Sequence, residues 1–276
     1  KILIENGNVC SLDLPLKFAQ KLYAEFAIRH PNAFYLRTRQ RGMQNWDGKI
    51  HYINKHGEFK IGLLPAVYEK CIEYGIKPKV VDMRQPLPKV NEVVTKIGEY
   101  KLRPEQEKAV KAVINNKVGK VPFQIGVLDY TVNAGKTLIM SSLYLSYKKQ
   151  LKTLLITNDS DWLNQARDEF KKYLPGEQIT FVQGKVLNWS NFTIGMVQSI
   201  SRNMRFYQNE LAKVDMVLVD EADQAGSKQY QNVLTRLFNT RVRIGLSGTI
   251  YMSKLAKDKV KNMNLEGFFG KVVAEF

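Results

Sequence analysis

Helical segments and short apolar runs alternate along residues 101–276, and this alternation constrains the fold more than any other feature. The run 216–219 contains no polar residue, as is typical of parallel strands whose two faces are both covered by helices. A sheet of this kind binds ligands at the carboxyl ends of its strands. The predicted helices are 104–116, 136–149 and 160–173, and the predicted strands are 124–129, 152–157, 193–197, 215–219 and 242–246. We therefore predict an α/β fold with a parallel sheet and helices on both faces.

The first 84 residues follow a different pattern, in which strand-like runs surround two helix-like segments. The strand-like runs are 2–4, 33–39, 49–53 and 79–82, and the helix-like segments are 16–29 and 63–74. Pro86 and Pro88 then interrupt regular structure, and a polar stretch follows to about residue 100. We predict a small α+β domain over residues 1–84, a linker over 85–100 and the α/β domain over 101–276.

The composition indicates a folded, strongly basic protein. A length of 276 residues suggests two domains, and a hydrophobic content of 44% excludes a disordered chain. Lys and Arg number 42 against 26 Asp and Glu, and the resulting net charge of +16 is spread over both sides of residue 100. We expect a polyanionic partner, with nucleic acid as the first candidate and an anionic membrane surface as the second.

Cysteine and histidine are too sparse to indicate a disulfide framework or a metal site. Cys10 and Cys71 form no C-x-x-C pair, and His30, His51 and His56 form no H-x-x-x-H pair. We expect these histidines to be ordinary surface or loop residues. No apolar run approaches the roughly 18 residues that span a bilayer, and no signal-peptide pattern is present. A cytoplasmic protein with no membrane partner is expected, and a first residue other than Met is consistent with a fragment.

A Gly-Lys-Thr segment lies between a predicted strand and a predicted helix, the context in which a phosphate loop works. Backbone N–H groups at the helix start attract an anion, Lys136 supplies a charge for the β- and γ-phosphates, and the Thr137 hydroxyl can bind Mg²⁺. Tyr130 occupies the place of the first glycine in the strict G-x-x-x-x-G-K-[ST] pattern. ATP and Mg²⁺ are the expected cofactors. The candidate nucleotide-binding residues of this loop are Thr131, Val132, Asn133, Ala134, Gly135, Lys136 and Thr137.

Three acidic residues, Asp220, Glu221 and Asp223, follow directly on the apolar run 216–219. Carboxylates at the end of a buried strand are costly unless a cation or charged ligand is near. Asp220 is a candidate Mg²⁺ ligand, and Glu221 is a candidate for orienting the water that attacks the γ-phosphate. The simpler alternative is a group of acids that caps the next helix.

Two further segments indicate a nucleotide site only in combination with the Gly-Lys-Thr segment and the acidic residues 220–223. Ser247, Gly248 and Thr249 follow the strand predicted at 242–246, where a simple turn is the alternative. Arg103, Pro104 and Gln106 precede or begin the helix before the phosphate loop. The oxygen and nitrogen of the Gln106 amide could both bond to one edge of an adenine, and a solvent-facing glutamine is the alternative.

In this order, the segments resemble the motifs of superfamily 2 helicases over about residues 101–276. The resemblance implies a RecA-like ATPase domain in which Lys136, Asp220 and Glu221 are catalytic. It also implies that Arg103 and Gln106 recognise adenine, and that Asp223, Ser247 and Thr249 couple hydrolysis to movement. Gln165, within 157–165, and Gln198, within 196–199, match two weaker nucleic-acid motifs. Asn133 stands where the family often has glycine.

Segments 41–50 and 57–64 resemble the N-terminal domain of the phage UvsW-type helicases, which remodel branched DNA. This resemblance implies ATP-driven branch migration, fork regression or junction unwinding, in the host-cell cytoplasm if the protein is phage-encoded. The implied partner is DNA with forks or four-way junctions, and no obligate protein partner is visible.

The N-terminal residues offer their own candidates for DNA contacts. If 35–41 is a strand, Arg37, Arg39 and Arg41 project from one face as a row suited to phosphates. Trp46 could stack on an unpaired base, and Lys49 adds a nearby cation. The alternatives are a solvated face for the arginines and a core position for Trp46.

The sequence alone is also compatible with other functions. Superfamily 2 helicases draw arginines from a second RecA-like domain, and no motif of such a domain follows Thr249 here, so we expect this chain alone to bind DNA but to hydrolyse ATP poorly. A non-motor nucleic-acid-binding protein with a degenerate ATPase fold is one alternative. An RNA helicase and the ATPase of a restriction or packaging machine are the others.

Overall fold

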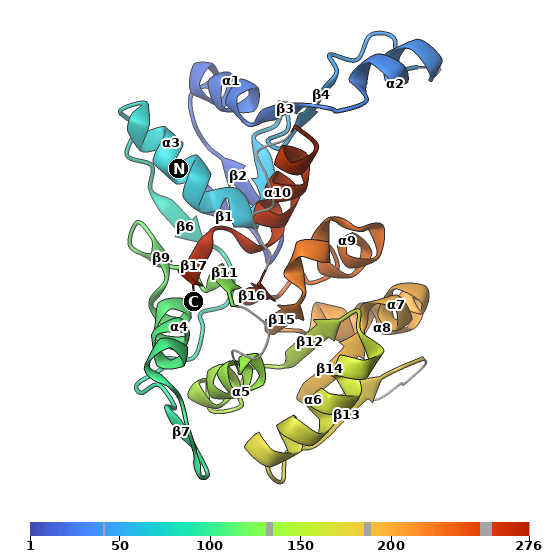
Figure 1. Cartoon of the computed structure of the whole chain (residues 1–276). Coiled ribbons are helices and arrows are strands. Elements are labelled where there is room, and N and C mark those ends of the chain that lie inside the picture. Colours follow the sequence, from blue (N-terminus) through green and yellow to red (C-terminus); the bar gives the residue numbers. More distant parts are fainter. Residues whose placement is uncertain (41, 131–134, 185–188, 249–255, 276) are drawn as a thin grey trace.

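The structure is a computed structural model, and it describes residues 1–40, 42–130, 135–184, 189–248 and 256–275. Its centre is a seven-stranded sheet in which every pairing is parallel (Figure 1). The strands, in spatial order, are β13 (Ile179–Val182), β14 (Phe192–Met196), β12 (Thr153–Thr157), β15 (Met216–Asp220), β16 (Val242–Ser247), β11 (Ile125–Asp129) and β17 (Val272–Glu275). The predicted parallel α/β fold is confirmed.

Helices bury both faces of this sheet, as the apolar strands require. In β15, Met216 and Leu218 belong to one hydrophobic cluster with α4, α5 and α6. Val217 and Val219 point the other way, into a cluster with α7 to α10. The helices are α4 (Pro104–Asn115), α5 (Lys136–Ser146), α6 (Ser160–Tyr173), α7 (Val197–Arg202), α8 (Met204–Ala212), α9 (Lys228–Leu234) and α10 (Ala256–Phe269).

The N-terminal part is a small α+β unit, as predicted. Its four-stranded sheet has the order β5-β2-β1-β6, in which β1 pairs with β6 in parallel and the other pairs are antiparallel. The elements are β1 (Ile2–Ile4), β2 (Val9–Leu12), α1 (Leu16–Glu25), β3 (Ala27–Arg29), α2 (Ala33–Arg39), β4 (Lys49–His51), β5 (Glu58–Lys60), η1 (Ile61–Leu63), α3 (Leu64–Glu73) and β6 (Val80–Asp82). The helix expected to reach residue 29 ends at Glu25, because β3 pairs with β4.

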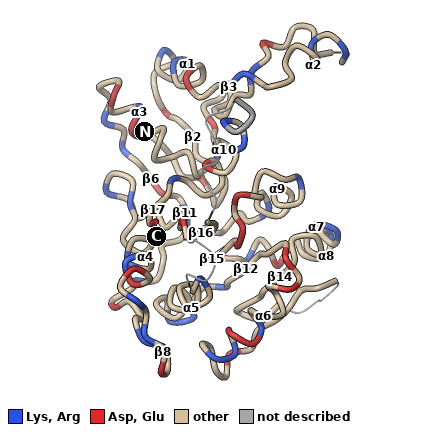
Figure 2. The backbone as a smooth tube through the Cα atoms, viewed as in Figure 1, with Lys and Arg blue, Asp and Glu red and all other residues tan. Residues whose placement is uncertain are grey.

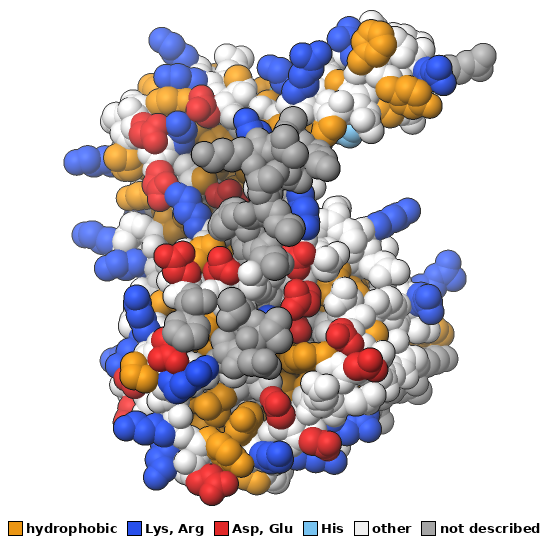
Figure 3. Space-filling view, viewed as in Figure 1, with side chains coloured by type: hydrophobic (Ala, Val, Ile, Leu, Met, Phe, Trp, Pro, Cys, Tyr) orange, Lys and Arg blue, Asp and Glu red, His pale blue; other side chains and the backbone are white. Residues whose placement is uncertain are grey.

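The strand prediction for residues 33–39 is wrong, because this segment is the helix α2. Two interactions inside the helix favour this conformation. The Thr38 hydroxyl donates to the Phe34 carbonyl (3.0 Å), and the Arg39 guanidinium lies 5.1 Å from the centre of the Tyr35 ring. The arm formed by α2 stands away from the rest of the molecule (Figures 1 and 3). Phe34 and Tyr35 remain exposed on it, so no sheet takes up their aromatic rings.

The segment predicted as a linker packs against the larger part. Val94 accepts a hydrogen bond from Ser142 and donates one to Ser146 (3.0 Å), both on α5. Two short hairpins flank α4, and β17 and β13 were not expected from the sequence. The hairpin strands are β7 (Lys96–Ile97), β8 (Tyr100–Lys101), β9 (Lys117–Val118) and β10 (Val121–Pro122).

The N-terminal part and the sheet domain share a packed interface. Phe123 and Ile125 of the sheet domain belong to the hydrophobic cluster of the N-terminal part. Arg243 of β16 is fully buried and donates hydrogen bonds to the Gly7 carbonyl (2.8 Å) and the Asn8 Oδ1 (2.7 Å). The two parts therefore form one body in this structure.

Charge and membrane features are simple. Lys and Arg residues are distributed over both parts of the chain (Figure 2). Within the described residues, no helix is both long and apolar enough to cross a membrane.

Candidate functional site

Four neighbouring strands end together with polar residues at one edge of the sheet. Thr157 ends β12, Asp220 ends β15, Ser247 ends β16 and Asp129 ends β11. Because these strands are parallel and adjacent, their carboxyl ends form one functional edge. The sequence predicted a functional segment after each of these four strands: 157–165 after β12, 220–223 after β15, 247–249 after β16 and the phosphate loop after β11.

Helix α5 begins at this edge, directly after Gly135. Gly135 has a φ of +73°, a left-handed conformation that costs glycine little. A side chain at this position would also overlap with the Gln106 amide. Glycine therefore lets α5 start close to α4, and its missing side chain leaves the first backbone N–H groups of α5 without a cap from that residue.

Lys136, the first residue of α5, faces the acidic end of β15. Its Nζ lies 3.5 Å from Asp220 Oδ1 and 3.6 Å from Glu221 Oε1. The three predicted catalytic residues are thus in contact, although Lys136 and Asp220 are 84 positions apart in the sequence.

The acidic pair sits in an unfavourable environment for charge. Burial raises the pKa of the Asp220 carboxyl, whose residue is only 3% exposed, and the Lys136 ammonium partly opposes this shift. Burial also raises the pKa of Glu221, against the same ammonium. Glu221 has a φ of +52°, which is strained for a residue with a side chain. Strain and buried charge at one place are typical of functional sites.

A pocket of about 310 Å³ lies between α5, α6 and the end of β15. Thr137 lines it beside Lys136, so its hydroxyl is placed where a metal bound by Asp220 could also be reached. Gln165, predicted as a DNA contact, lies in the wall of this pocket. The sequence missed the α6 contribution to the wall, which comes from Trp162, Gln165, Ala166, Glu169 and Tyr173.

The predicted coupling residues Asp223 and Ser247 also meet. The Ser247 hydroxyl donates to Asp223 Oδ1 (3.4 Å), and the Gln224 amide donates to Asp223 Oδ2 (2.9 Å). Asp223 is nearly buried, at 7% exposed. This contact connects the end of β15 to the end of β16. Thr249 lies outside the described residues, as do Thr131, Val132, Asn133 and Ala134.

The segment expected to recognise adenine forms the start of α4. The Arg103 backbone N–H donates to Gln106 Oε1 (2.9 Å), and the Arg103 guanidinium pairs with Glu105 (3.0 Å). Gln106 is almost fully buried, so the alternative of a solvent-facing glutamine is wrong. Its contact with adenine stays a prediction.

Tyr130 explains how the chain tolerates the missing glycine of the phosphate-loop pattern. Its ring is buried in the cluster beneath α4 and α5, and its hydroxyl donates to the Glu105 carbonyl (2.9 Å). Its backbone N–H donates to the Ser247 carbonyl (2.9 Å). Tyr130 therefore connects the end of β11 to α4 and β16, a structural role that the aromatic residue after the strand could have suggested.

The residues present fit a nucleotide with Mg²⁺. A helix start with free backbone N–H groups and a lysine suits phosphates. Mg²⁺ bound to phosphates and water needs only one or two protein oxygens, and Asp220 and Thr137 can provide them. No cluster of three or more His, Cys, Asp or Glu residues that could hold a metal occurs among the described residues.

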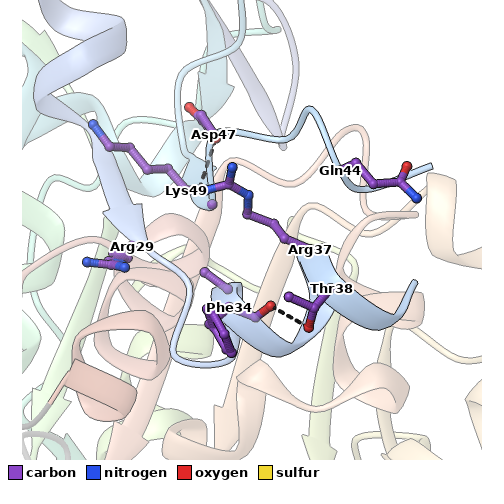
Figure 4. A pocket seen from close by; sticks show the side chains of 9 residues that line it. Arg29, Phe34, Arg37, Thr38, Gln44, Asp47 and Lys49 are labelled. Atoms are coloured by element: carbon purple, nitrogen blue, oxygen red, sulfur yellow. Dashed lines mark hydrogen bonds between the residues drawn. The ribbon is translucent and has the colours of Figure 1, made fainter. Parts of the chain in front are cut away.

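A second pocket of about 480 Å³ lies on the N-terminal arm (Figure 4). Arg37 of α2 and Lys49 of β4 line it together with Arg29 of β3, which the sequence did not single out. Asp47 accepts a hydrogen bond from the Lys49 backbone N–H (2.9 Å) and fixes the turn before β4. The remaining named residues of the wall in Figure 4 are Phe34, Thr38 and Gln44.

The predicted arginine row is wrong, because residues two apart in a helix lie on nearly opposite sides. Arg37 faces the pocket, whereas Arg39 stacks on Tyr35. Arg41 lies outside the described residues. Trp46 is half-buried, with its indole N–H donating to the Lys49 carbonyl (2.9 Å) and its ring edge-on to His30.

Gln198, the other predicted nucleic-acid contact, lies at the start of α7. Its amide nitrogen donates to the Asn158 carbonyl (3.2 Å), which connects α7 to the end of β12. Its Oε1 is buried, with no hydrogen-bond partner among the described residues. Contacts of Gln165 and Gln198 with DNA stay predictions.

Together, the parallel sheet, the lysine at the start of α5 and the two carboxylates that face it define the class of RecA-like, phosphate-loop nucleotide-binding domains. Residues 99–252, more than half of the chain, match the family model described as Type III restriction enzyme, res subunit. The chain therefore belongs to this family.

Similar proteins include two viral helicases. The ATP-dependent DNA helicase uvsW of Enterobacteria phage T4 is 22% identical over 250 residues, which are 83% of this chain and 47% of that protein. A protein of Acanthamoeba polyphaga mimivirus, named provisionally as an ATP-dependent RNA helicase, is 26% identical over 148 residues, which are 53% of this chain and 27% of that protein. The chain thus spans less than half the length of each of these curated relatives.

The fold matches that of UvsW over the whole chain. A crystal structure of the phage T4 UvsW helicase aligns with a TM-score of 0.74 and 19% identity, and the alignment covers 100% of this chain and 99% of that one. The Hef helicase domain of Pyrococcus furiosus aligns with 62% of this chain at a TM-score of 0.50. The predicted resemblance to UvsW-like superfamily 2 helicases is confirmed.

Proposed function

We propose that this chain forms the DNA-binding part and the first motor domain of an ATP-dependent DNA helicase or translocase that acts on branched DNA. One observation carries the proposal: Lys136 contacts both Asp220 and Glu221 at the carboxyl edge of a parallel sheet. The match to uvsW over 83% of the chain supports DNA as the substrate. Fork regression, branch migration and junction unwinding are the reactions we infer, in the cytoplasm.

The residues of the site divide the chemistry of ATP hydrolysis among them. Lys136 and the N–H groups at the start of α5 would bind the phosphates, and Thr137 and Asp220 would hold Mg²⁺, which would neutralise charge on the phosphate oxygens. Glu221 accepts a proton from the attacking water, and its raised pKa brings it closer to the range that suits a general base.

The contact between Asp223 and Ser247 is suited to coupling hydrolysis to movement. Asp223 is two residues beyond Glu221, so a change around the γ-phosphate alters its surroundings directly. Ser247 then passes this change to β16, which lies beside β11.

We infer that DNA binds along the basic face that includes the α2 arm. Figure 3 shows Lys and Arg side chains on the arm and also across a recess, over the region of α7 to α9. Arg202 and Arg205 in this region are exposed, as are Arg37 and Lys49 on the arm. Cations on both sides of a recess can contact two segments of a DNA backbone. A branched substrate provides two such segments.

The other functions considered for the sequence remain competitors. The mimivirus relative carries the name of an RNA helicase, and the family description names a restriction enzyme. The contact of Lys136 with Asp220 and Glu221 argues against a degenerate ATPase site, because a site without a nucleotide has no reason to retain these buried charges.

Strand separation by the full-length protein tests the proposal. We expect ATP-dependent unwinding of forked and four-way DNA, with less activity on linear duplex DNA and on RNA of the same sequence. Lys136→Ala should abolish unwinding but leave DNA affinity within about twofold, whereas the control Lys172→Ala, on the exposed side of α6, should resemble the wild type. Preferential unwinding of the RNA, or full activity of Lys136→Ala, would contradict the proposal.

A further inference from the structure

Helix α10 lies between the N-terminal part and the sheet (Figure 1) and packs against both. On one side it contacts η2 (Ala222–Gly226), the short helix that carries Asp223. On the other side it contacts η1, in the N-terminal part. Phe268 and Phe269 belong to the hydrophobic cluster of the sheet domain, and Met263 packs against that of the N-terminal part. The helix therefore belongs to both cores.

At the nucleotide-site end, α10 contributes a cation to Asp223. The Lys261 Nζ lies 3.6 Å from Asp223 Oδ2, while the other oxygen, Oδ1, accepts the hydrogen bond from Ser247. The Asp223 side chain is 9% exposed and the Lys261 side chain 44% exposed, so solvent screens this ion pair from the lysine side only. One carboxylate on η2 thus connects the end of β16 with α10.

On the side that faces the N-terminal part, α10 is held tightly to it. The Tyr52 hydroxyl donates to the Val260 carbonyl (3.2 Å), and the Lys60 Nζ lies 3.9 Å from the centre of the Phe268 ring. Gly62 of η1 approaches the helix so closely that a side chain there would overlap with the Glu266 carbonyl oxygen. Backbones in direct contact leave little room for independent movement.

We propose that α10 couples the nucleotide site to the N-terminal part, with Lys261 as the positioning residue that senses Asp223. The coupling rests on the proposed function, because it needs a nucleotide that changes the surroundings of Asp223. When the Asp223 carboxylate changes its partners, the ion pair with Lys261 is made or lost. The α10 helix then shifts against η2, and its close packing on η1 moves the N-terminal part with it. Nucleotide binding thereby changes the affinity of the N-terminal part for DNA.

The test measures how a nucleotide changes DNA affinity. In the full-length protein, the dissociation constant for a forked DNA duplex is measured with and without Mg²⁺ and adenosine 5′-(β,γ-imido)triphosphate, and the ratio of the two constants is the coupling. Lys261→Met keeps the length of the side chain but removes its charge. We expect it to reduce this ratio by at least about threefold towards one, while affinity for the nucleotide alone changes less than about twofold.

Two further variants separate coupling from general damage to the helix. Lys259→Met removes an exposed charge from the same helix, two residues away and thus on a different side, and should retain the wild-type ratio. Tyr52→Phe removes the hydrogen bond to Val260 at the far end of the coupling path. It should reduce the ratio in the same direction as Lys261→Met, although neither Tyr52 nor its hydroxyl contacts the nucleotide site.

The outcomes distinguish this inference from the proposed function. If the wild-type protein binds neither forked DNA nor the nucleotide, the proposed function fails. If it binds both but the ratio is one, or if Lys261→Met retains the wild-type ratio, the role of α10 is overturned. An equal loss of the ratio in Lys261→Met and Lys259→Met would also overturn it, because the effect would then not depend on Asp223.

Discussion

Lys136 stabilises two carboxylates that would otherwise face one another without a counter-charge. The ammonium lies within 3.6 Å of both Asp220 and Glu221, and burial raises the pKa of each acid. Removing one partner of a buried ion pair costs more folding free energy than the whole pair contributes, because the remaining buried charge has lost its counter-charge. Loss of Lys136 would therefore leave the Asp220 and Glu221 carboxylates without their shared counter-charge.

Replacing Glu221 with Gln should separate nucleotide binding from hydrolysis. The amide keeps the size of the side chain but cannot accept a proton from water, so ATP turnover should fall by about 10²- to 10⁴-fold. Nucleotide affinity should stay within a few-fold, because Lys136 and Asp220 remain. Turnover and nucleotide binding are measured on the same preparation, with the exposed Glu92→Gln as control. Normal turnover by Glu221→Gln would exclude it as the base.

The lowered pKa of Lys60 predicts that the folded protein becomes more stable at alkaline pH. Burial and the nearby Arg243 charge lower the pKa of Lys60 to about 8, below its ordinary value in an unfolded chain. Between about pH 8 and 10.5 the unfolded state then binds more protons than the folded state, so this residue makes the free energy of unfolding increase with pH. The contribution is complete above the unfolded pKa and is lost as the pH falls through about 8.

Urea unfolding across this pH range provides the measurement. Lys60→Met removes the titrating group and should flatten the pH dependence relative to the wild type, whereas Lys55→Met, an exposed neighbour, should not. An unchanged slope in Lys60→Met would show that the Lys60 ammonium is not destabilised in the folded protein.

Among the elements, the central sheet could be predicted because the sequence of each main strand is informative by itself. Strands β11, β12, β15 and β16 are near-continuous apolar runs, and each ends at a polar residue, so their type and the functional edge followed from the sequence. The direct contact between Lys136 and Asp220 was not predicted and is seen only in the structure. The short β13 and β17 were missed because four residues carry too little periodicity.

The α2 arm could not be predicted, because its residues favour a strand by intrinsic preference. Phe34 and Tyr35 are aromatic residues, which strands favour, and Arg37 and Arg39 are spaced by two, as on one face of a strand. The segment is nevertheless a helix, since no strand among the described residues pairs with it and Ala33 is its buried residue. The contribution of α6 to the nucleotide pocket was likewise invisible, as it depends on how one helix lies over another.

Removing charge from the α2 arm should change the salt dependence of DNA binding. Each phosphate contact contributes about −0.9 to the slope of log affinity against log salt. Arg37→Gln should therefore make the slope less negative by about 0.9, the value of one phosphate contact, and weaken binding at low salt. Lys172→Gln, on α6 and not on the α2 arm, should leave the slope unchanged. Affinity for a forked duplex is measured between about 50 and 200 mM salt. Identical slopes for Arg37→Gln and the wild type would remove the arm from the DNA interface.

At the scale of the whole molecule, the two parts are held as one body by buried polar contacts as well as by α10. Arg243 is fully buried, and its Nη2 donates to Gly7 and Asn8 of the N-terminal part, while its Nε and Nη1 have no hydrogen-bond partner among the described residues. A buried cation with unsatisfied donors is costly, so it specifies how the parts meet more than it adds to stability.

Two substitutions of Arg243 should therefore have different effects. Arg243→Ala leaves a cavity and removes both hydrogen bonds, and should lower the free energy of unfolding by about 3 kcal/mol. Arg243→Met fills most of the space without a buried charge and should be clearly less destabilising, by about 1 kcal/mol or less. Chemical denaturation measures both. Equal destabilisation by the two variants would contradict this account of the interface.

ATP turnover with and without forked DNA tests the central claim, a nucleotide-driven motor built on the Lys136 site, most directly. In the full-length protein we expect forked DNA to stimulate turnover at least about tenfold, and Lys136→Ala to lower the stimulated rate by about 10²- to 10³-fold while forked DNA remains bound. Turnover that does not respond to DNA, or that survives in Lys136→Ala, would contradict the claim.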